Sequence, residues 1–340
     1  MRHILCLALL AAATLLGSCS KTSSPSEPGP STMFWLDSGN LAIESFSNAH
    51  PAIGEPVSIA RVVTGTSTRL AATAAAAVLD AAGNRLFVAN GNEILVFDNA
   101  SAANGNVTPN RVIRKFGGDF VNVVSLSLDT SLNLLYVGDK NVSGTVPSIY
   151  VIGSASTANN LVTPVSITDN STSDRRFVFV DAAHDVLYVV DNTCQVSVFN
   201  AASMRNGLST PTNQFSSCTT LDNGDHPLWL DANHDELYVL NPSNADPGVM
   251  VFQGASTASG SVLPGRTIHG FPLDPAASLR NIFLDTTNHN RLYVASTFAL
   301  FILDNASTLN GTLVSGVFPS QQLSGIIGLD MAAVAINTIP

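Results

Sequence analysis

Three cationic side chains recur at one position along this chain, because Arg176, His226 and Arg280 each stand five residues before an aspartate that closes an apolar run. An arginine guanidinium presents a fork of N–H donors that matches a carboxylate or a phosphate. If the three runs lie side by side, their side chains could bind a small anionic ligand or an acidic group of a partner. Each also has an aspartate nearby in sequence: Asp174, Asp225 or Asp274. We favour internal pairing with these carboxylates over ligand binding.

The closing aspartates and the histidines near them are a second candidate group. The aspartates recur at Asp80, Asp129, Asp181, Asp231 and Asp285, and three histidines follow in His184, His234 and His289. Asp and His are common metal ligands. However, an aspartate at a strand end also accepts hydrogen bonds from the next turn. Because each copy belongs to a different repeat, we expect turn residues and predict no metal site.

Four cysteines complete the inventory. Cys6 lies in an apolar leader and Cys19 directly follows it, so Cys194 and Cys218 are the thiols left in the body of the chain. Export implies an oxidising compartment. The two cysteines fall in connections expected to open on the same face of one repeat, so we predict a disulfide between them. The alternative is two free, half-buried thiols.

The elements that must position these residues are short apolar runs. In Leu79–Ile113 an apolar run ends in Leu-Asp, and a polar turn separates it from a Leu-Phe-Val run. A Val-Phe run, an Ala-Ser pair, a glycine and a proline follow in turn. Strand-sized runs rich in β-branched and aromatic residues, separated by Gly, Asn, Asp or Pro, are typical of antiparallel meanders. The unit is therefore predicted to have four strands.

This unit repeats along the chain. The closing aspartates are 49, 52, 50 and 54 residues apart, which gives five full copies. A sixth copy is divided between the ends, because residues 33–63 supply second, third and fourth strands and Ala332–Asn337 resembles a first strand. A last strand that completes the first sheet would close a ring and remove two open edges. The sequence thus predicts an all-β, six-bladed β-propeller of four-stranded antiparallel blades over residues 33–340, closed by its C-terminal strand.

Two motifs resemble the NHL and YVTN groups of propeller repeats, namely Tyr188-Val189-Val190-Asp191 and Tyr136-Val137-Gly138-Asp139. Such propellers serve as binding modules, scaffolds and enzymes, so the resemblance implies a fold and leaves function open. Six-bladed lactonase-like enzymes hold a divalent ion with carboxylates near the channel. No carboxylate occupies the position five residues before the closing aspartates, which counts against that chemistry.

The N-terminus predicts the cellular location. Met1-Arg2-His3 is basic, residues 4–16 are apolar, and Leu16-Gly17-Ser18-Cys19 resembles the lipobox of bacterial lipoproteins. The resemblance implies a signal peptide over residues 1–18 and acylation of Cys19, including palmitate-like chains; the alternative is a plain secretory leader. Several acyl chains anchor stably where one does not. Residues 19–32 are rich in Ser and Pro and are predicted to be a flexible tether. Ser20 favours the outer membrane of the cell envelope.

Composition limits the partners. The formal net charge is −10, or −11 once the leader with Arg2 is removed, and such a chain would be repelled by nucleic acid. We expect a monomer that contacts the membrane through its lipid anchor only and needs no cofactor. The chain contains no serine-nucleophile elbow, P-loop or GxGxxG motif. The favoured hypothesis is therefore a non-catalytic binding or scaffolding lipoprotein, and the alternative is a lactonase-like hydrolase at the channel mouth.

Overall fold

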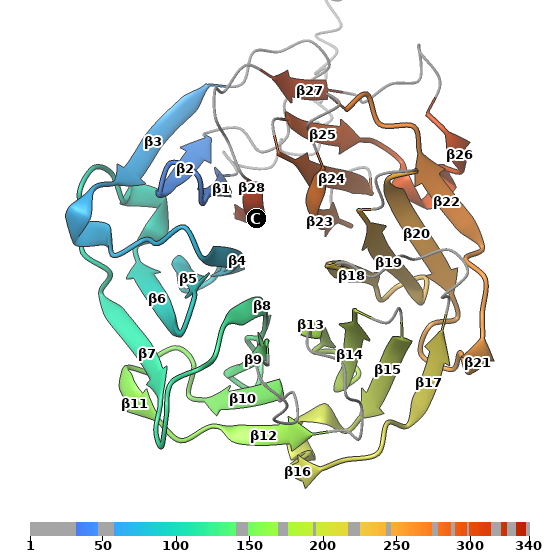
Figure 1. Cartoon of the computed structure of the whole chain (residues 1–340), viewed down its shortest axis with the longest axis horizontal. Coiled ribbons are helices and arrows are strands. Elements are labelled where there is room, and N and C mark those ends of the chain that lie inside the picture. Colours follow the sequence, from blue (N-terminus) through green and yellow to red (C-terminus); the bar gives the residue numbers. More distant parts are fainter. Residues whose placement is uncertain are drawn as a thin grey trace, which may run out of the picture.

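Six β-sheets stand around a common centre, as Figure 1 shows for the computed structural model of the chain. The structure describes residues 32–46, 58–140, 149–168, 176–192, 195–216, 225–242, 246–273, 278–286, 290–297, 299–313, 321–324 and 331–337, with backbone only for residue 176 and the last two ranges. The predicted all-β ring of six blades is confirmed. Within the described ranges, no helix has the length and apolar character of a membrane span.

Each blade runs from the centre of the ring to its rim through four strands. The innermost, first strands are β28 (Met331–Asn337) in blade 1, β4 (Ala74–Asp80), β8 (Val123–Asp129), β13 (Arg176–Asp181), β18 (Leu228–Asp231) and β23 (Leu279–Asp285). The second strands are β1 (Thr32–Asp37), β5 (Arg85–Asn90), β9 (Leu134–Asp139), β14 (Val186–Asp191), β19 (Glu236–Asn241) and β24 (Arg291–Ser296). The third strands are β2 (Ala42–Phe46), β6 (Glu93–Asp98), β10 (Ile149–Gly153), β15 (Gln195–Asn200), β20 (Gly248–Gln253) and β25 (Ala299–Leu303). The fourth strands are β3 (Ile59–Thr64), β7 (Arg111–Lys115), β12 (Val165–Thr168), β17 (Asn213–Ser216), β22 (Arg266–His269) and β27 (Gln321–Ser324).

The last strand of the chain lies beside the first. β28 pairs antiparallel with β1, with Met33 opposite Ile336 and Thr32 opposite Asn337. Asn337 thus takes the place opposite β1 that Asp80 takes opposite Arg85 in blade 2. The pairing of the C-terminal segment with the N-terminal blade is therefore the one that the repeat spacing predicted.

The prediction of four-stranded blades was incomplete. In four blades of the described structure, a short strand from the next blade adds a fifth, parallel strand outside the fourth. These strands are β11 (Asn160–Val162), β16 (Gly207–Leu208), β21 (Gly260–Ser261) and β26 (Gly311–Thr312). Gly105 forms a single parallel bridge of the same kind to Val63 of blade 1. The fourth strands of blades 1 to 5 are therefore contacted along their outer edge by the next blade.

A hydrogen-bonded contact between the inner turn of a blade and its outer connection, here called the rim clamp, explains the repeated Ala-Ser pair. Four short 3₁₀ turns occur in the described ranges. The first, η1 (Thr66–Thr68), lacks the Ala-Ser pair. The other three begin with it: η2 (Ala100–Ala102), η3 (Ala202–Met204) and η4 (Ala306–Thr308). In blade 5, Asp235 lies in the turn after the first strand at φ 50°, and its carboxylate accepts from the Ser256 N–H at 2.9 Å and the Ser256 hydroxyl at 2.7 Å. The buried Ala255 donates its N–H to the Asp235 carbonyl at 3.2 Å. Each clamp therefore joins the first turn of a blade to its third-to-fourth connection.

The core lies between blades rather than within one. Both faces of each inner strand pack against a neighbouring blade, which is why the strands are near-continuous apolar runs rather than alternating ones. Tyr136, Tyr188, Tyr238 and Tyr293 of the second strands are fully buried in these interfaces. The ring is therefore a rigid frame whose centre is lined by the six first strands.

Candidate functional site

The repeated aspartates accept hydrogen bonds from the turns that follow them. The Asp80 carboxylate accepts from the Gly83 N–H at 2.8 Å, and Asp129 accepts from the Ser131 and Leu132 N–H groups at 2.8 and 3.0 Å. Equivalent bonds recur in the next two blades. The prediction that these carboxylates shape turns is confirmed for the first four, and most of the turn after Asp285 lies outside the described residues.

Two of the three histidines lie in the same turns. Nδ1 of His184 is 2.7 Å from Oδ2 of Asp181, and Nδ1 of His234 is 2.7 Å from Oδ2 of Asp231. The hydrogen bond to Asp231 raises the pKa of His234 above its ordinary value. Both side chains are exposed on separate blades, as turn residues should be. His289 lies outside the described residues.

The structure does not gather the predicted cationic trio into a described site. His226 is fully buried, precedes β18, and places its Nδ1 3.0 Å from the Leu240 carbonyl, so its ring offers no surface to a ligand. Arg280 is exposed at a β-bulge in β23, where one extra residue interrupts the pairing. Arg176 begins β13, and its side chain lies outside the described part. The anionic site therefore stays a prediction for the two arginines, and His226 is not one of its contacts.

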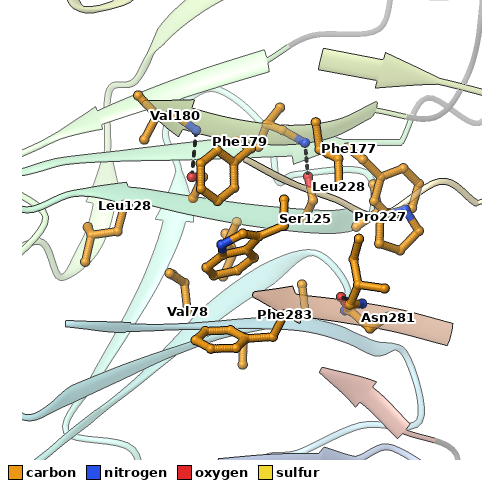
Figure 2. A pocket seen from close by; sticks show the side chains of 18 of the residues that line it. Val78, Ser125, Leu128, Phe177, Phe179, Val180, Pro227, Leu228, Asn281 and Phe283 are labelled. Carbon is orange, nitrogen blue, oxygen red and sulfur yellow. Dashed lines mark hydrogen bonds between the residues drawn. The ribbon is translucent and has the colours of Figure 1, made fainter. Parts of the chain in front are cut away.

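A cavity of about 270 Å³ lies at the centre of the ring, between the first strands of blades 2–6. Figure 2 shows side chains from these strands converging on it. Its lining is apolar apart from Ser125, Ser127 and Asn281, and no charged side chain is among the described lining residues. The volume is close to the lower end of the range for ligand pockets, roughly 300–1,000 Å³. The described lining of this cavity is therefore uncharged and mostly apolar.

Three aromatic rings from consecutive blades form one wall of this cavity, here called the aromatic wall: Phe179, Trp229 and Phe283. The ring centroids of Phe179 and Trp229 are 4.9 Å apart at an interplanar angle of 59°, and those of Trp229 and Phe283 are 4.4 Å apart at 52°. Such tilted contacts are typical of favourable aromatic pairs. All three side chains remain partly exposed. Because they lie in the interior of the ring, their exposed surface faces the cavity.

Two serines satisfy the backbone beside the cavity. The inner edge of β13 would otherwise leave its N–H groups unpaired, since a first strand has a neighbouring strand on one side only. The Val178 N–H donates to the Ser125 hydroxyl at 3.0 Å and the Val180 N–H donates to the Ser127 hydroxyl at 2.9 Å, as the dashed lines in Figure 2 mark. The cavity wall is thereby fixed without a charged group.

A second cavity, of about 350 Å³, adjoins the first toward the side where the first strands end. Both are lined by the aromatic wall and Val180, so the three rings separate the two spaces. The second has a polar floor that includes Asp181, Asn233 and Asp285. The described channel therefore changes from apolar to polar along its axis. In the described residues, no group of three or more His, Cys, Asp or Glu side chains is arranged to hold a metal ion.

Comparison with solved structures identifies the architecture. The chain folds as a β-propeller. It is similar to the WD40 β-propeller domain of Doa1, with a TM-score of 0.52 over 88% of this chain and 81% of that one, at 10% sequence identity. At that identity the likeness shows the fold alone. No known protein family and no curated protein matches the sequence.

The remaining predicted residues of the propeller protein lie outside the described ranges. These are Cys19, the proposed lipid attachment site, and both members of the predicted disulfide, Cys194 and Cys218. The aromatic wall, in contrast, is described and was not predicted. Aligning the repeats at the position two residues before each closing aspartate would have found it, since Phe, Trp and Phe occupy that position in three successive copies.

Proposed function

We propose that this protein is a lipoprotein of the bacterial cell envelope whose propeller is a non-catalytic binding module, with a small ligand held in the central cavity. The observation that carries the proposal is the cavity itself: an uncharged space of about 270 Å³ with partly exposed aromatic side chains inside a rigid ring. Concave, mostly apolar sites with few polar groups are the usual form of small-molecule sites.

Anchoring rests on the sequence of the leader. Cys19 follows Leu16-Gly17-Ser18, and the Ser- and Pro-rich segment to residue 32 would hold the propeller away from the lipid surface. In cells fed labelled palmitate, the wild-type chain should carry label and fractionate with the outer membrane. Cys19→Ser should lose both properties. Cys6→Ser, which changes a cysteine of the leader, is the matched control and should keep them.

Ligand binding is tested on the Cys19→Ser chain, purified from its source cells under native conditions. Native mass spectrometry should show one non-covalent small molecule for each chain, which is released when the protein is denatured. A chain that carries no small molecule, and that binds neither envelope metabolites nor an envelope protein, would contradict the binding function.

Binding of an anionic group by the two arginines is a second part of the proposal and can be tested separately from the cavity. Arg176 and Arg280 belong to the first strands of blades 4 and 6, so an anionic group of a ligand or partner could meet them near the start of these strands. Binding of an anionic ligand should weaken in the Arg176→Ala, Arg280→Ala double variant. Unchanged binding would remove these residues from the site and leave the cavity as its centre.

A further inference from the structure

The position two residues before each closing aspartate differs sharply around the ring. Blades 2 to 6 carry Val78, Ser127, Phe179, Trp229 and Phe283 there. By its pairing with Phe34, the equivalent residue of blade 1 is Ala335. The large aromatic residues are therefore confined to blades 4–6, and small residues occupy the other three blades. A sixfold repeat that needed one residue type here would not divide in this way.

The fold itself does not require aromatic residues at this position. Blade 2 builds the same first strand with Val78, which pairs opposite Phe87, and blade 3 builds it with Ser127, opposite Tyr136. In blades 4 and 5, Phe179 and Trp229 occupy the same register. Since the first strand also forms with valine or serine at this position, strand formation does not explain the aromatic wall. Its explanation has to lie in the space that it faces.

The wall faces an unfilled slot. Across the cavity from it lie Ala76, Ala77 and Val78 of blade 2, together with Ser127 of blade 3. Aromatic surface that stays in contact with water forgoes the stabilisation that burial would give. A flat ring inserted between the aromatic wall and these small side chains would recover that stabilisation. A flexible chain would fill the same space but would lose conformational freedom on binding.

The side chains described in the lining disfavour a charged occupant. An ion placed among these side chains would lose its hydration without gaining a partner of opposite charge, which is strongly unfavourable. The polar groups present are neutral, namely two serine hydroxyls and the Asn281 amide. They tolerate a hydroxyl, amine or carbonyl on the ligand.

We propose that the central cavity binds an uncharged, planar aromatic molecule, which stacks against Trp229 between the aromatic wall and the small side chains of blades 2 and 3. This inference rests on the proposed binding function and names the chemical class of its ligand. It makes no use of Arg176 or Arg280.

The chain supplies its own reporter, because it contains two tryptophans. Trp35 is fully buried away from the cavity, and Trp229 is partly exposed in it. A Trp35→Phe variant leaves Trp229 as the single indole. Titration of this variant, in the full chain with Cys19→Ser, with the neutral aromatic probe N-phenyl-naphthylamine should quench Trp229 saturably, with one probe bound to each chain.

A filling variant tests where the probe binds. Val78→Phe places in blade 2 the residue that blades 4 and 6 already carry at the equivalent position, so the strand should form normally while the slot is occupied. Probe affinity, measured by probe fluorescence, should fall at least tenfold. The matched control is Val121→Phe on the exposed surface, 47% exposed in the wild type, which should change affinity less than twofold. Trp229→Leu should also weaken binding at least tenfold.

Two further ligands define the class. Anilinonaphthalene sulfonate, the charged analogue of the probe, and decanol, an uncharged flexible chain, should each bind at least tenfold more weakly. Tighter binding of the sulfonate, weakened by the double arginine variant, would overturn the aromatic class and keep the binding function with an anionic ligand. Equal or tighter binding of decanol would likewise overturn the planar class alone.

If none of the three probes binds, or if Val78→Phe binds the neutral probe as the wild type does, the cavity is not the site and this inference fails. The native mass spectrum then decides separately whether the protein binds a ligand elsewhere.

Discussion

The rim clamps and the centre of the ring are built from the same repeated unit, but they differ in how faithfully the unit repeats. In the clamps, an Asn or Asp in the first turn binds a serine of the same blade in blades 2 to 5: Asn84 with Ser101, Asn133 with Ser156, Asp185 with Ser203 and Asp235 with Ser256. At the centre, equivalent positions carry alanine, valine, serine, phenylalanine or tryptophan.

This difference separates two tasks. A residue that recurs in every copy meets a need that every copy has, such as a turn held at positive φ or a connection tied to a strand. A residue type that occurs in only some of the blades is explained by contacts that only those blades make, such as contacts with a ligand. Substitutions at repeated rim positions should therefore act on folding stability, and substitutions at the varied centre should act on binding.

The largest effect is expected at the rim, where Arg266 fixes the outer part of blade 5 to blade 6. Its guanidinium donates to the Glu236 carboxylate and to the Ala306 and Leu309 carbonyls, the last two at 2.7 and 3.0 Å. The Arg266 and Glu236 side chains are 10% and 9% exposed. Arg266→Met leaves the buried Glu236 carboxylate without its cation, with only the Tyr238 hydroxyl and the Gln253 amide donating to it. The free energy of unfolding in urea should therefore fall by about 3–5 kcal/mol.

A partly exposed arginine provides the control for this substitution. Arg205 also donates to two carbonyls, those of Asn200 and Thr210, but on the surface of blade 4. Arg205→Met should cost less than about 1 kcal/mol, because solvent replaces the lost bonds. If both variants lost equal stability, the loss in Arg266→Met could not be attributed to the burial of its ion pair.

A buried glutamate in blade 1 breaks the repeat inside a blade rather than at the centre. Glu44 lies opposite Trp35 in β2, where the equivalent residues of the other blades are Leu95, Tyr150, Ser197, Met250 and Phe301. Its side chain is 7% exposed, and among the described residues its Oε2 has no hydrogen-bond partner. Burial, reinforced by repulsion from Asp37, raises the pKa of Glu44 to about 7.

The sign of the pH dependence follows from this raised pKa. Between the ordinary value of 4.5 and about 7, the folded chain holds a proton at Glu44 that the unfolded chain has released, so the group's contribution to stability falls as pH rises through this window. Glu44→Gln should remove that slope and stabilise the protein above pH 7 by on the order of 3 kcal/mol. Urea unfolding of both chains at a series of pH values measures the difference.

Replacing a carboxylate that has cationic partners should change stability in the opposite direction. Glu93 is also buried, but it accepts from Arg69 at 2.8 Å and from Arg114 at 2.9 Å. Glu93→Gln should therefore destabilise the chain at pH 8, where Glu44→Gln stabilises it. A Glu44→Gln variant with the wild-type pH profile would mean that Glu44 is not buried as a carboxyl in solution.

The sequence predicted the ring because the closing aspartates are so evenly spaced, and it predicted the partner of the last strand because residues 332–337 lie one period beyond Asp285. It did not predict the fifth strands, since segments such as Gly260–Ser261 are too short and polar to carry an apolar pattern. Their pairing with the preceding blade is a tertiary contact. Local sequence gives no signal for such a contact.

One member of the cationic trio, His226, was misplaced for a local reason. Counting five residues back from the closing aspartate assumes that all first strands have one length. β18 begins only at Leu228, so His226 falls before the strand and into the interior. Arg280, in contrast, is the extra residue of a bulge that recurs at the same position in β4, β8 and β28. Strand starts depend on the neighbouring strand, whereas strand ends are fixed locally by the aspartate and its turn.

The rim clamp itself allows a finer test through Asp235. Asp235→Ala removes both bonds to Ser256 and places an alanine at φ 50°, so it should cost about 1–2 kcal/mol. Asp235→Asn should cost less than half as much, because Asn84 and Asn133 form the same clamp in blades 2 and 3. Thermal unfolding of the two variants measures the ratio. Equal losses would show that charge, rather than the hydrogen-bonded turn, holds the clamp.

The smallest effect on stability is expected at the centre, where the comparison predicts the largest effect on binding. Phe179→Leu keeps an apolar side chain in a first strand that blades 2 and 3 build with Val78 and Ser127, so stability should change by about 1 kcal/mol or less. The same variant removes one ring of the aromatic wall from its 4.9 Å contact with Trp229 and should weaken binding of the neutral aromatic probe severalfold. Urea unfolding and probe titration on one preparation give both quantities. A large loss of stability with unchanged binding would reverse the division between rim and centre, because the aromatic residues would then be part of the frame.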